Sequence, residues 1–255
     1  MRRALVGRVD LIGGGPGPAD LLTIRAYRLL MAADVVVADR LGPFEELRRE
    51  LPPHVEVIDV GKQPGNHPVP QHEINRLIVA HALAGRRVVR LKGGDPFVLG
   101  RGGEEVLACE AAGVPVTVTP GISSAISVPQ AAGIPVTHRG VASAVHVVNG
   151  HGDLAPSALA ALRDRTVTTV ILMGVASLPR LAASALASGA RGDTAVAIVE
   201  NGHTERQRTI RSTLADVAKD ARAAQVVNPS VIVIGEVARA GLLLPTTAML
   251  SESMT

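Results

Sequence analysis

The stretch that decides the fold is residues 90–105, RLKGGDPFVLGRGGEE. An apolar run through Val88 to Leu91 is typical of a buried strand, and it stops at two glycines, an aspartate and a proline. A second glycine cluster, residues 100–103, leads into two glutamates and a helical pattern. Glycine loses more backbone entropy on folding than any other residue, so five of the 26 glycines in one short stretch need a reason. The stretch therefore predicts a strand, a turn whose backbone approaches a ligand, and a helix.

The same alternation of strand and helix extends to both sides of this stretch. We expect strands at Arg8–Ile12, Val35–Ala38, Val55–Val60, Arg87–Leu91 and Val116–Val118. We expect helices at Leu21–Ala32, Gln71–Ala84, Gly103–Ala112 and Ser123–Ala132. Strands that alternate with helices of this length are typical of a largely parallel sheet with helices on both faces.

A second block follows the segment AGIPVTHRG. We expect its strands at Ala144–Asn149, Thr168–Met173, Thr194–Val199, Gln207–Ile210 and Ser230–Ile234, and its helices at Ser157–Arg163, Leu178–Ala187 and Thr213–Ala224. The alternating residues after Gln207 favour an antiparallel strand, so the second sheet should be mixed. The sequence thus predicts two α/β domains, residues 1–139 and 140–255.

Composition narrows the class of protein. Apolar residues make up 47% of the 255 and aromatic residues only 1%, so stacking of nucleic-acid bases on aromatic rings is not expected. The net charge of +3 is mild, and no run of about 20 apolar residues predicts a membrane span. Cys109 is the single cysteine, which fits a reducing cytoplasm and excludes an internal disulfide. The eight histidines lack the spacing of a metal site, so no metal is expected.

Four glycine-rich turns follow predicted strands, where an open α/β sheet binds its ligands. They are residues 13–18, 93–96, 120–124 and 200–204. None of them carries the Lys-Ser/Thr pair of a P-loop. The first turn has Gly13 and Gly15 of a dinucleotide fingerprint but Pro18 at its third position, so a nicotinamide site is disfavoured. A ligand held mainly by backbone, without a phosphate grip, remains.

With these turns in place, the chain resembles the tetrapyrrole methylases that use S-adenosylmethionine (SAM), and among them those that act on uroporphyrinogen III. The motifs that carry the resemblance are VDLIGGGPGPADLLT, ADVVVADRL, GKQPGNHPVPQHEIN, RLKGGDPFVLGRGGEE, PGISSAISVPQAAGIPVTHRG, VILMG and VENGHTERQR. The resemblance implies a two-domain fold with the ligand cleft between the domains. It also implies methylation of uroporphyrinogen III at carbons 2 and 7 to give precorrin-2, in the sirohaem and cobalamin pathways, by a cytoplasmic homodimer.

The resemblance also implies roles for individual residues. It assigns SAM binding to Pro16, Gly93, Gly94, Asp95, Val98, Ser123, Ser124, Met173 and Gly202. It assigns catalysis to Asp39, Lys62, Arg101 and Glu104, with the first two as proton acceptor and donor, and substrate binding to Arg101 and Arg139. An arginine fork suits the eight carboxylates of the substrate.

Several of these residues also admit structural roles. Asp95 can form a turn, Met173 can fill a core, and Arg101 can pair with a neighbouring glutamate to hold a helix start. Two other functions stay open, a methylase for a later corrinoid and a binding protein without catalysis. Because the chain leaves no room for a fused dehydrogenase–chelatase, we expect a separate protein to take the product onward.

Overall fold

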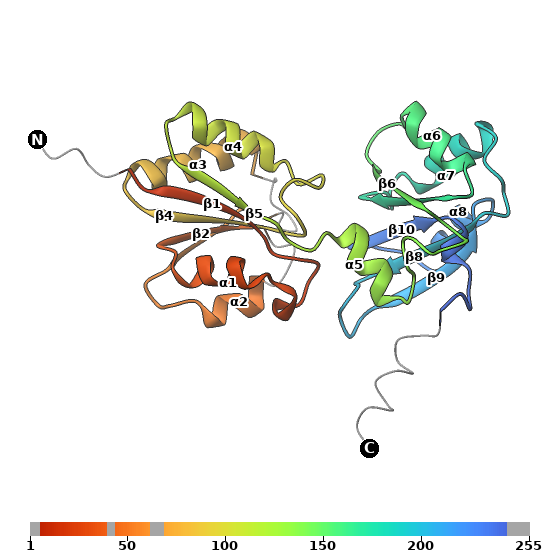
Figure 1. The fold of residues 1–255 in the computed structure, drawn as a ribbon, viewed down its shortest axis with the longest axis horizontal. Helices are drawn as coiled ribbons and strands as arrows, with labels where there is room; N and C mark the ends of the chain where they lie inside the picture. Colours follow the sequence, from red (N-terminus) through yellow and green to blue (C-terminus); the bar gives the residue numbers. More distant parts are fainter. Residues whose placement is uncertain (1–5, 40–43, 62–68, 244–255) are drawn as a thin grey trace, which may run out of the picture. The chain divides into compact units, whose positions relative to one another are not determined.

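The computed structural model describes residues 6–39, 44–61 and 69–243, which fall in two compact units (Figure 1). The first unit spans Met1–Ser123 and the second Ser124–Thr255. The predicted boundary at residue 139 lies later in the chain than this division, because Ala125 and Val128 belong to the core of the second unit. No helix in the described ranges is long and apolar enough to cross a membrane.

The first unit is a parallel sheet covered by helices on both faces. Its strands are β1 (Arg8–Gly13), β2 (Val35–Ala38), β3 (Glu56–Asp59), β4 (Arg87–Lys92) and β5 (Val116–Thr119), in the order β3-β2-β4-β1-β5. Its helices are α1 (Ile24–Met31), α2 (Phe44–Glu50), α3 (Gln71–Leu83) and α4 (Gly102–Ala111), with a short 3₁₀ turn at Ala19–Leu21. All four strand pairs are parallel, as predicted.

Alternate residues of each strand supply two separate cores. Val35 and Val37 of β2 pack in the cluster that includes α3 and α4, whereas Val36 and Ala38 pack in the cluster of α1 and α2. Figure 1 shows the two helix pairs on opposite faces of the sheet. Because both faces are covered, most side chains of the central strands are apolar, and β2 is apolar throughout; the buried charges Asp10 of β1 and Arg90 and Lys92 of β4 are exceptions.

The second unit is a mixed sheet, also as predicted. Its strands are β6 (Ala144–Asn149), β7 (Val167–Leu172), β8 (Ala195–Glu200), β9 (Arg208–Thr213) and β10 (Ser230–Ile234), in the order β6-β7-β10-β8-β9. Only β6 and β7 pair in parallel among these strands. Its helices are α5 (Ser124–Ala131), α6 (Pro156–Arg163), α7 (Leu178–Ala187) and α8 (Val217–Ala223), with a 3₁₀ turn at Glu236–Ala238. One face is covered by α6, α7 and α8, and the other by α5.

Two elements differ most from the sequence expectation. Helix α2 was not predicted, because its seven residues, FEELRRE, hold only two apolar side chains; Phe44 and Leu47 form a helix by packing into the α1 core. The helix expected from Thr213 begins later, at Val217, because β9 continues through Thr213 along the whole of β8. In both cases tertiary packing overrides the local pattern.

Candidate functional site

Three glycine-rich turns meet at the carboxyl edge of the first sheet. The turn after β1 pairs with the turn after β4: the Gly94 N–H donates to the Gly15 carbonyl at 2.7 Å, and the Gly15 N–H donates to the Gly94 carbonyl at 3.2 Å. The turn after β5 lies against both. A Cβ at Gly121 would be 2.3 Å from the Gly94 oxygen, and one at Gly13 would be 2.4 Å from the Gly121 nitrogen. Glycine is therefore required here for backbone-to-backbone packing of the three turns.

This packing modifies the sequence interpretation, in which the first glycine pair served to make room for a ligand. Gly94 has a φ of 65°, a left-handed conformation that favours glycine by itself. Gly100 and Gly102 have a similar structural reason, since a Cβ on either would be 2.7 Å or 2.6 Å from the Pro96 carbonyl oxygen. By contrast, apart from the adjacent residues and the backbone of α4 itself, no atom lies within 4 Å of the Cβ position of Gly103. Backbone geometry thus accounts for three of the five glycines in residues 90–105, namely Gly94, Gly100 and Gly102.

Asp95 holds this set of turns together. Its Oδ1 accepts from the Phe97 N–H at 2.8 Å, and its Oδ2 accepts from the Gly121 N–H at 3.1 Å. Its carbonyl accepts from the Val98 N–H at 3.3 Å. The structural role considered for Asp95 is therefore present: both carboxylate oxygens bind backbone donors, one of them in the neighbouring turn.

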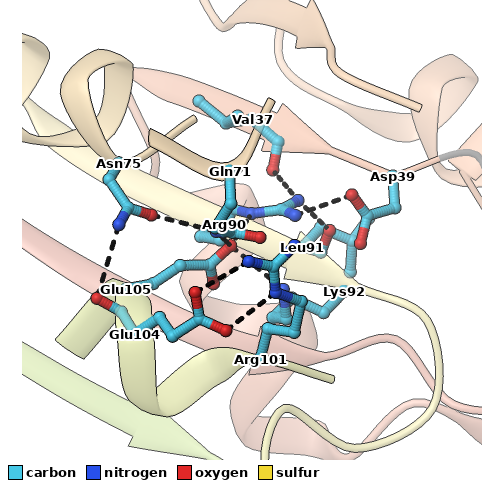
Figure 2. Close-up of polar contacts among 10 residues, drawn as sticks. All are labelled: Val37, Asp39, Gln71, Asn75, Arg90, Leu91, Lys92, Arg101, Glu104 and Glu105. Carbon is cyan, nitrogen blue, oxygen red and sulfur yellow. Dashed lines mark hydrogen bonds and ion pairs between the residues drawn. The ribbon is translucent and has the colours of Figure 1, made fainter. Parts of the chain in front are cut away.

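A network of charged side chains lies beside the turns, and Figure 2 shows Arg90 at its centre between Asp39 and Glu105. Arg90 is on β4 and is 1% exposed. Its Nη2 donates to Asp39 Oδ1 at 2.6 Å, and its Nε donates to Glu105 Oε1 at 3.0 Å. Lys92, two residues further along β4 and on the same face of the strand, donates to the same Glu105 oxygen at 3.0 Å. Buried charged side chains need partners of opposite charge, because each charge is costly to remove from water.

The electrostatics of the network follow from burial and pairing. Burial lowers the pKa of Arg90, but Asp39 and Glu105 outweigh it and raise the pKa above its ordinary value, so the guanidinium stays charged. Burial, followed by the nearby Arg90 cation, lowers the pKa of Lys92. The Glu105 side chain is fully buried. Two basic side chains, Arg90 and Lys92, thus face two acidic ones, Asp39 and Glu105.

Arg101 and Glu104 form an exposed ion pair at the start of α4. Arg101 Nε donates to Glu104 Oε1 at 2.7 Å, and Nη2 donates to Oε2 at 2.8 Å, a two-pronged pair. The pairing raises the pKa of Arg101 and lowers that of Glu104. Arg101 precedes the helix in a left-handed conformation with φ 59°, and Leu99 has φ 56°. Strained backbone of this kind is concentrated at functional sites.

Most of the remaining predicted residues of the first unit lie along the carboxyl edge of its sheet. Asp39 follows β2 with its side chain 25% exposed, and Pro16, Gly93 and Val98 are half-buried. Lys62 lies outside the described residues.

Ser123 ends the first unit, and the second unit carries Ser124, the first residue of α5, together with Arg139, Met173 and Gly202. Met173 follows β7 with φ 57° and is 40% exposed, so it does not fill a core. Gly202 follows β8, and a Cβ there would be 2.7 Å from a Val128 methyl group. Its turn is tied to α5 by His203 Nε2, which lies 2.9 Å from the Ser127 carbonyl oxygen. Arg139 is exposed, in a turn closed by the His138 N–H donating to the Ala142 carbonyl at 2.9 Å.

Sequence reasoning missed Arg90, Lys92, Glu105 and Gln71 as parts of this arrangement. Gln71, the first residue of α3, donates from Nε2 to Glu105 Oε1 at 3.1 Å. The sequence did contain a signal for them. Arg90 and Lys92 lie two residues apart in a predicted buried strand, so both side chains point to the same face of the sheet and need buried partners. In the ranges that the structure covers, no three His, Cys, Asp or Glu side chains group as a metal site would require.

Comparisons with known proteins agree on one family. The profile described as tetrapyrrole (corrin/porphyrin) methylases matches residues 8–218. The siroheme synthase of Tolumonas auensis is 46% identical over 237 residues, which are 91% of this chain and 49% of that protein. The uroporphyrinogen-III C-methyltransferase of Methanocaldococcus jannaschii is 45% identical over 236 residues, 91% of this chain and 97% of that protein.

Solved structures point the same way. The uroporphyrin-III C-methyltransferase of Thermus thermophilus, crystallised with S-adenyl homocysteine, superposes with a TM-score of 0.77 at 40% identity over 91% of this chain and 98% of that chain. A cobalt precorrin-4 methyltransferase has a TM-score of 0.78 at 23% identity, which shows a shared fold alone. This chain spans about half the length of the siroheme synthases that it matches.

Proposed function

Because this chain belongs to the tetrapyrrole (corrin/porphyrin) methylase family, we propose that it methylates uroporphyrinogen III at carbons 2 and 7, with SAM as methyl donor, to give precorrin-2. The observation that carries this proposal is the 45% identity to the Methanocaldococcus jannaschii uroporphyrinogen-III C-methyltransferase along 97% of that protein. The motifs of the expected site lie within residues 8–218, which the family profile matches.

The turns at the carboxyl edge of the first sheet suit SAM. Gly93 and Gly94 are half-buried and carry no side chain, and Val98 adds a half-buried apolar group. Asp95 keeps the turns after β4 and β5 in register through its two carboxylate bonds. We assign SAM binding to these residues and to Pro16, Ser123, Ser124, Met173 and Gly202.

The charged residues suit the macrocycle. Arg101 offers a planar fork that now binds the Glu104 carboxylate and can bind a substrate carboxylate with the same geometry. Arg139 is exposed and offers a second fork. We assign substrate binding to these two arginines. When a substrate carboxylate binds Arg101, Glu104 either gives up its bonds to the guanidinium or keeps one of them.

The reaction needs little chemical help from side chains. SAM supplies an electrophilic methyl group when bound, and a pyrrole carbon is already electron-rich. The protein's main contribution is to hold the reacting atoms about 3–3.5 Å apart and in line. A proton must leave after transfer, and we assign its acceptance to Asp39, whose carboxylate is fixed by Arg90 yet 25% exposed, with Lys62 as proton donor.

One assay tests the proposal. Purified protein is incubated with SAM and enzymatically made uroporphyrinogen III, and the absorbance of precorrin-2 is followed. Precorrin-2 formation supports the proposal. Turnover of a later corrinoid in its place would identify the alternative methylase, and SAM binding without turnover of either would identify a binding protein. We also propose that the protein is a cytoplasmic homodimer; light scattering of the purified protein tests the dimer.

A further inference from the structure

Arg90 bridges two carboxylates that belong to different parts of the first unit. One is Asp39, which follows β2, at 2.6 Å from Nη2; the other is Glu105 of α4, at 3.0 Å from Nε (Figure 2). The third nitrogen, Nη1, donates to the carbonyls of Val37 at 3.2 Å and Leu91 at 3.0 Å. Each guanidinium nitrogen therefore has a fixed partner, and the fork has one orientation.

Glu105 is held at the other end of the bridge through one of its two carboxylate oxygens. Its Oε1 accepts from Arg90, from Lys92 Nζ at 3.0 Å and from Gln71 Nε2 at 3.1 Å. It follows Glu104 directly in the first turn of α4, and Asn75 Nδ2 lies 3.5 Å from the Glu104 carbonyl oxygen. The network thus holds the part of α4 that carries the Arg101–Glu104 pair.

A buried ion network of this kind is weak evidence for stability, because apolar residues of similar size can replace it at little cost. The position of the network in the fold is more informative than its contribution to stability. It joins the residue assigned to proton acceptance with the residues assigned to the substrate, through side chains that do not reach the surface. At the opposite end of the sheet, Arg87 at the start of β4 and Asp34 just before β2 form another pair at 3.2 Å, with side chains 49% and 34% exposed, that touches no assigned residue.

We propose that Arg90 and Glu105 are positioning residues that fix the Asp39 carboxylate relative to the Arg101–Glu104 pair. This inference rests on the proposed function. Arg90 sets the direction of the Asp39 carboxylate from β4, and Glu105 ties Arg90 to the start of α4. Both side chains are buried, so we expect neither to touch substrate. A lysine at position 90 keeps the positive charge but, as a single point of charge, cannot bind Asp39, Glu105 and two carbonyls in one geometry.

The test compares Arg90→Lys with Arg87→Lys, the same substitution on the same strand. For Arg90→Lys we expect kcat for precorrin-2 formation to fall about ten- to a hundredfold, because misplacement of about 1 Å costs on this order. The Kd for S-adenosylhomocysteine, measured by calorimetry, should stay within about twofold, since glycine turns hold that ligand. Arg87→Lys should leave kcat unchanged. Equal kcat in Arg90→Lys and wild type, or parallel losses of kcat and S-adenosylhomocysteine affinity, would overturn the inference.

A double-mutant cycle with Asp39→Asn shows whether Arg90 acts through Asp39. In the Asp39→Asn background, Arg90→Lys should lower single-turnover rates by less than about twofold. Full additivity would refute the inference. Should Arg90→Lys fail to fold, Glu105→Gln, which keeps the shape of the side chain, is expected to lower kcat about tenfold, and an unchanged kcat there refutes it equally. A wild-type protein that does not form precorrin-2 would refute the proposed function. This result is distinct from the variant outcomes that refute the positioning role.

Discussion

Replacing Gly102 by alanine should destabilise the protein, whereas the same substitution at Gly103, the next residue, should not. Both residues lie in the first turn of α4, where alanine gains up to about 1 kcal/mol of helix propensity over glycine. They differ in what a Cβ meets. At Gly102 it would lie 2.6 Å from the Pro96 carbonyl oxygen and 3.1 Å from the Pro96 carbonyl carbon, and at Gly103 it meets nothing within 4 Å.

The clash at Gly102 involves backbone, which cannot rotate away. Relief requires movement of the Pro96 turn, and this movement would stretch the bond from the Gly102 N–H to the Pro96 oxygen, now 3.0 Å. Overpacking of this kind costs about 1–3 kcal/mol. The gain in propensity is common to both substitutions and cancels, so the free energy of unfolding of Gly102→Ala should lie about 2 kcal/mol below that of Gly103→Ala.

Urea denaturation followed by circular dichroism measures this difference. The midpoint should fall for Gly102→Ala at constant slope, and should stay level or rise for Gly103→Ala. In a thermal scan the gap should be about 4–8 °C. If Gly102→Ala is as stable as Gly103→Ala, the close approach of α4 to Pro96 is not a constraint, and the argument that glycine is needed there fails.

Arg101→Lys should lower kcat/KM for uroporphyrinogen III about ten- to a hundredfold, since lysine loses the two-pronged bond to a carboxylate. The melting temperature and S-adenosylhomocysteine affinity should barely change, because the Arg101–Glu104 pair is exposed; a matched loss in all three would remove Arg101 from the site. Burial raises the pKa of Glu200, but donation from Arg208 and the Val227 N–H outweighs it and holds the pKa below its ordinary 4.5. The stabilisation from this carboxylate is present above that value and is lost as pH falls through the lower folded pKa, so Glu200→Gln should flatten the acid side of the stability–pH curve; an unchanged curve contradicts the pairing. Burial raises the pKa of the Cys109 thiol to about 11, so a thiol reagent should label it in urea but not in the native protein near pH 8, and rapid native labelling would contradict its burial.

The strands of the first unit could be predicted from the sequence because their signal is local. Residues 35–38 are four apolar residues in a row, and β2 has these same bounds. A strand buried on both faces needs only apolar neighbours along the chain, and these are visible without knowledge of the fold. The glycine turns were located for the same reason, since each follows such a run directly.

The reason for the glycines required the tertiary structure. Gly13 and Gly121 lie more than a hundred residues apart in the chain, yet a Cβ on Gly121 would be 2.6 Å from the Gly13 Cα. That approach exists because β1 lies between β4 and β5, so the turns after all three strands meet at one edge. Nothing in the sequence around either glycine specifies which other turn will lie against it.

The charged network shows the same division. The sequence alone determines that Arg90 and Lys92 share one face of an apolar strand, and therefore that they need partners. Only the tertiary structure decides that the partners are Asp39 and Glu105. Strand order places β4 beside β2, and the packing of α4 brings Glu105 to β4. Hydrophobic periodicity is a property of neighbours along the chain, whereas the pairing of buried charges depends on which elements the fold brings side by side.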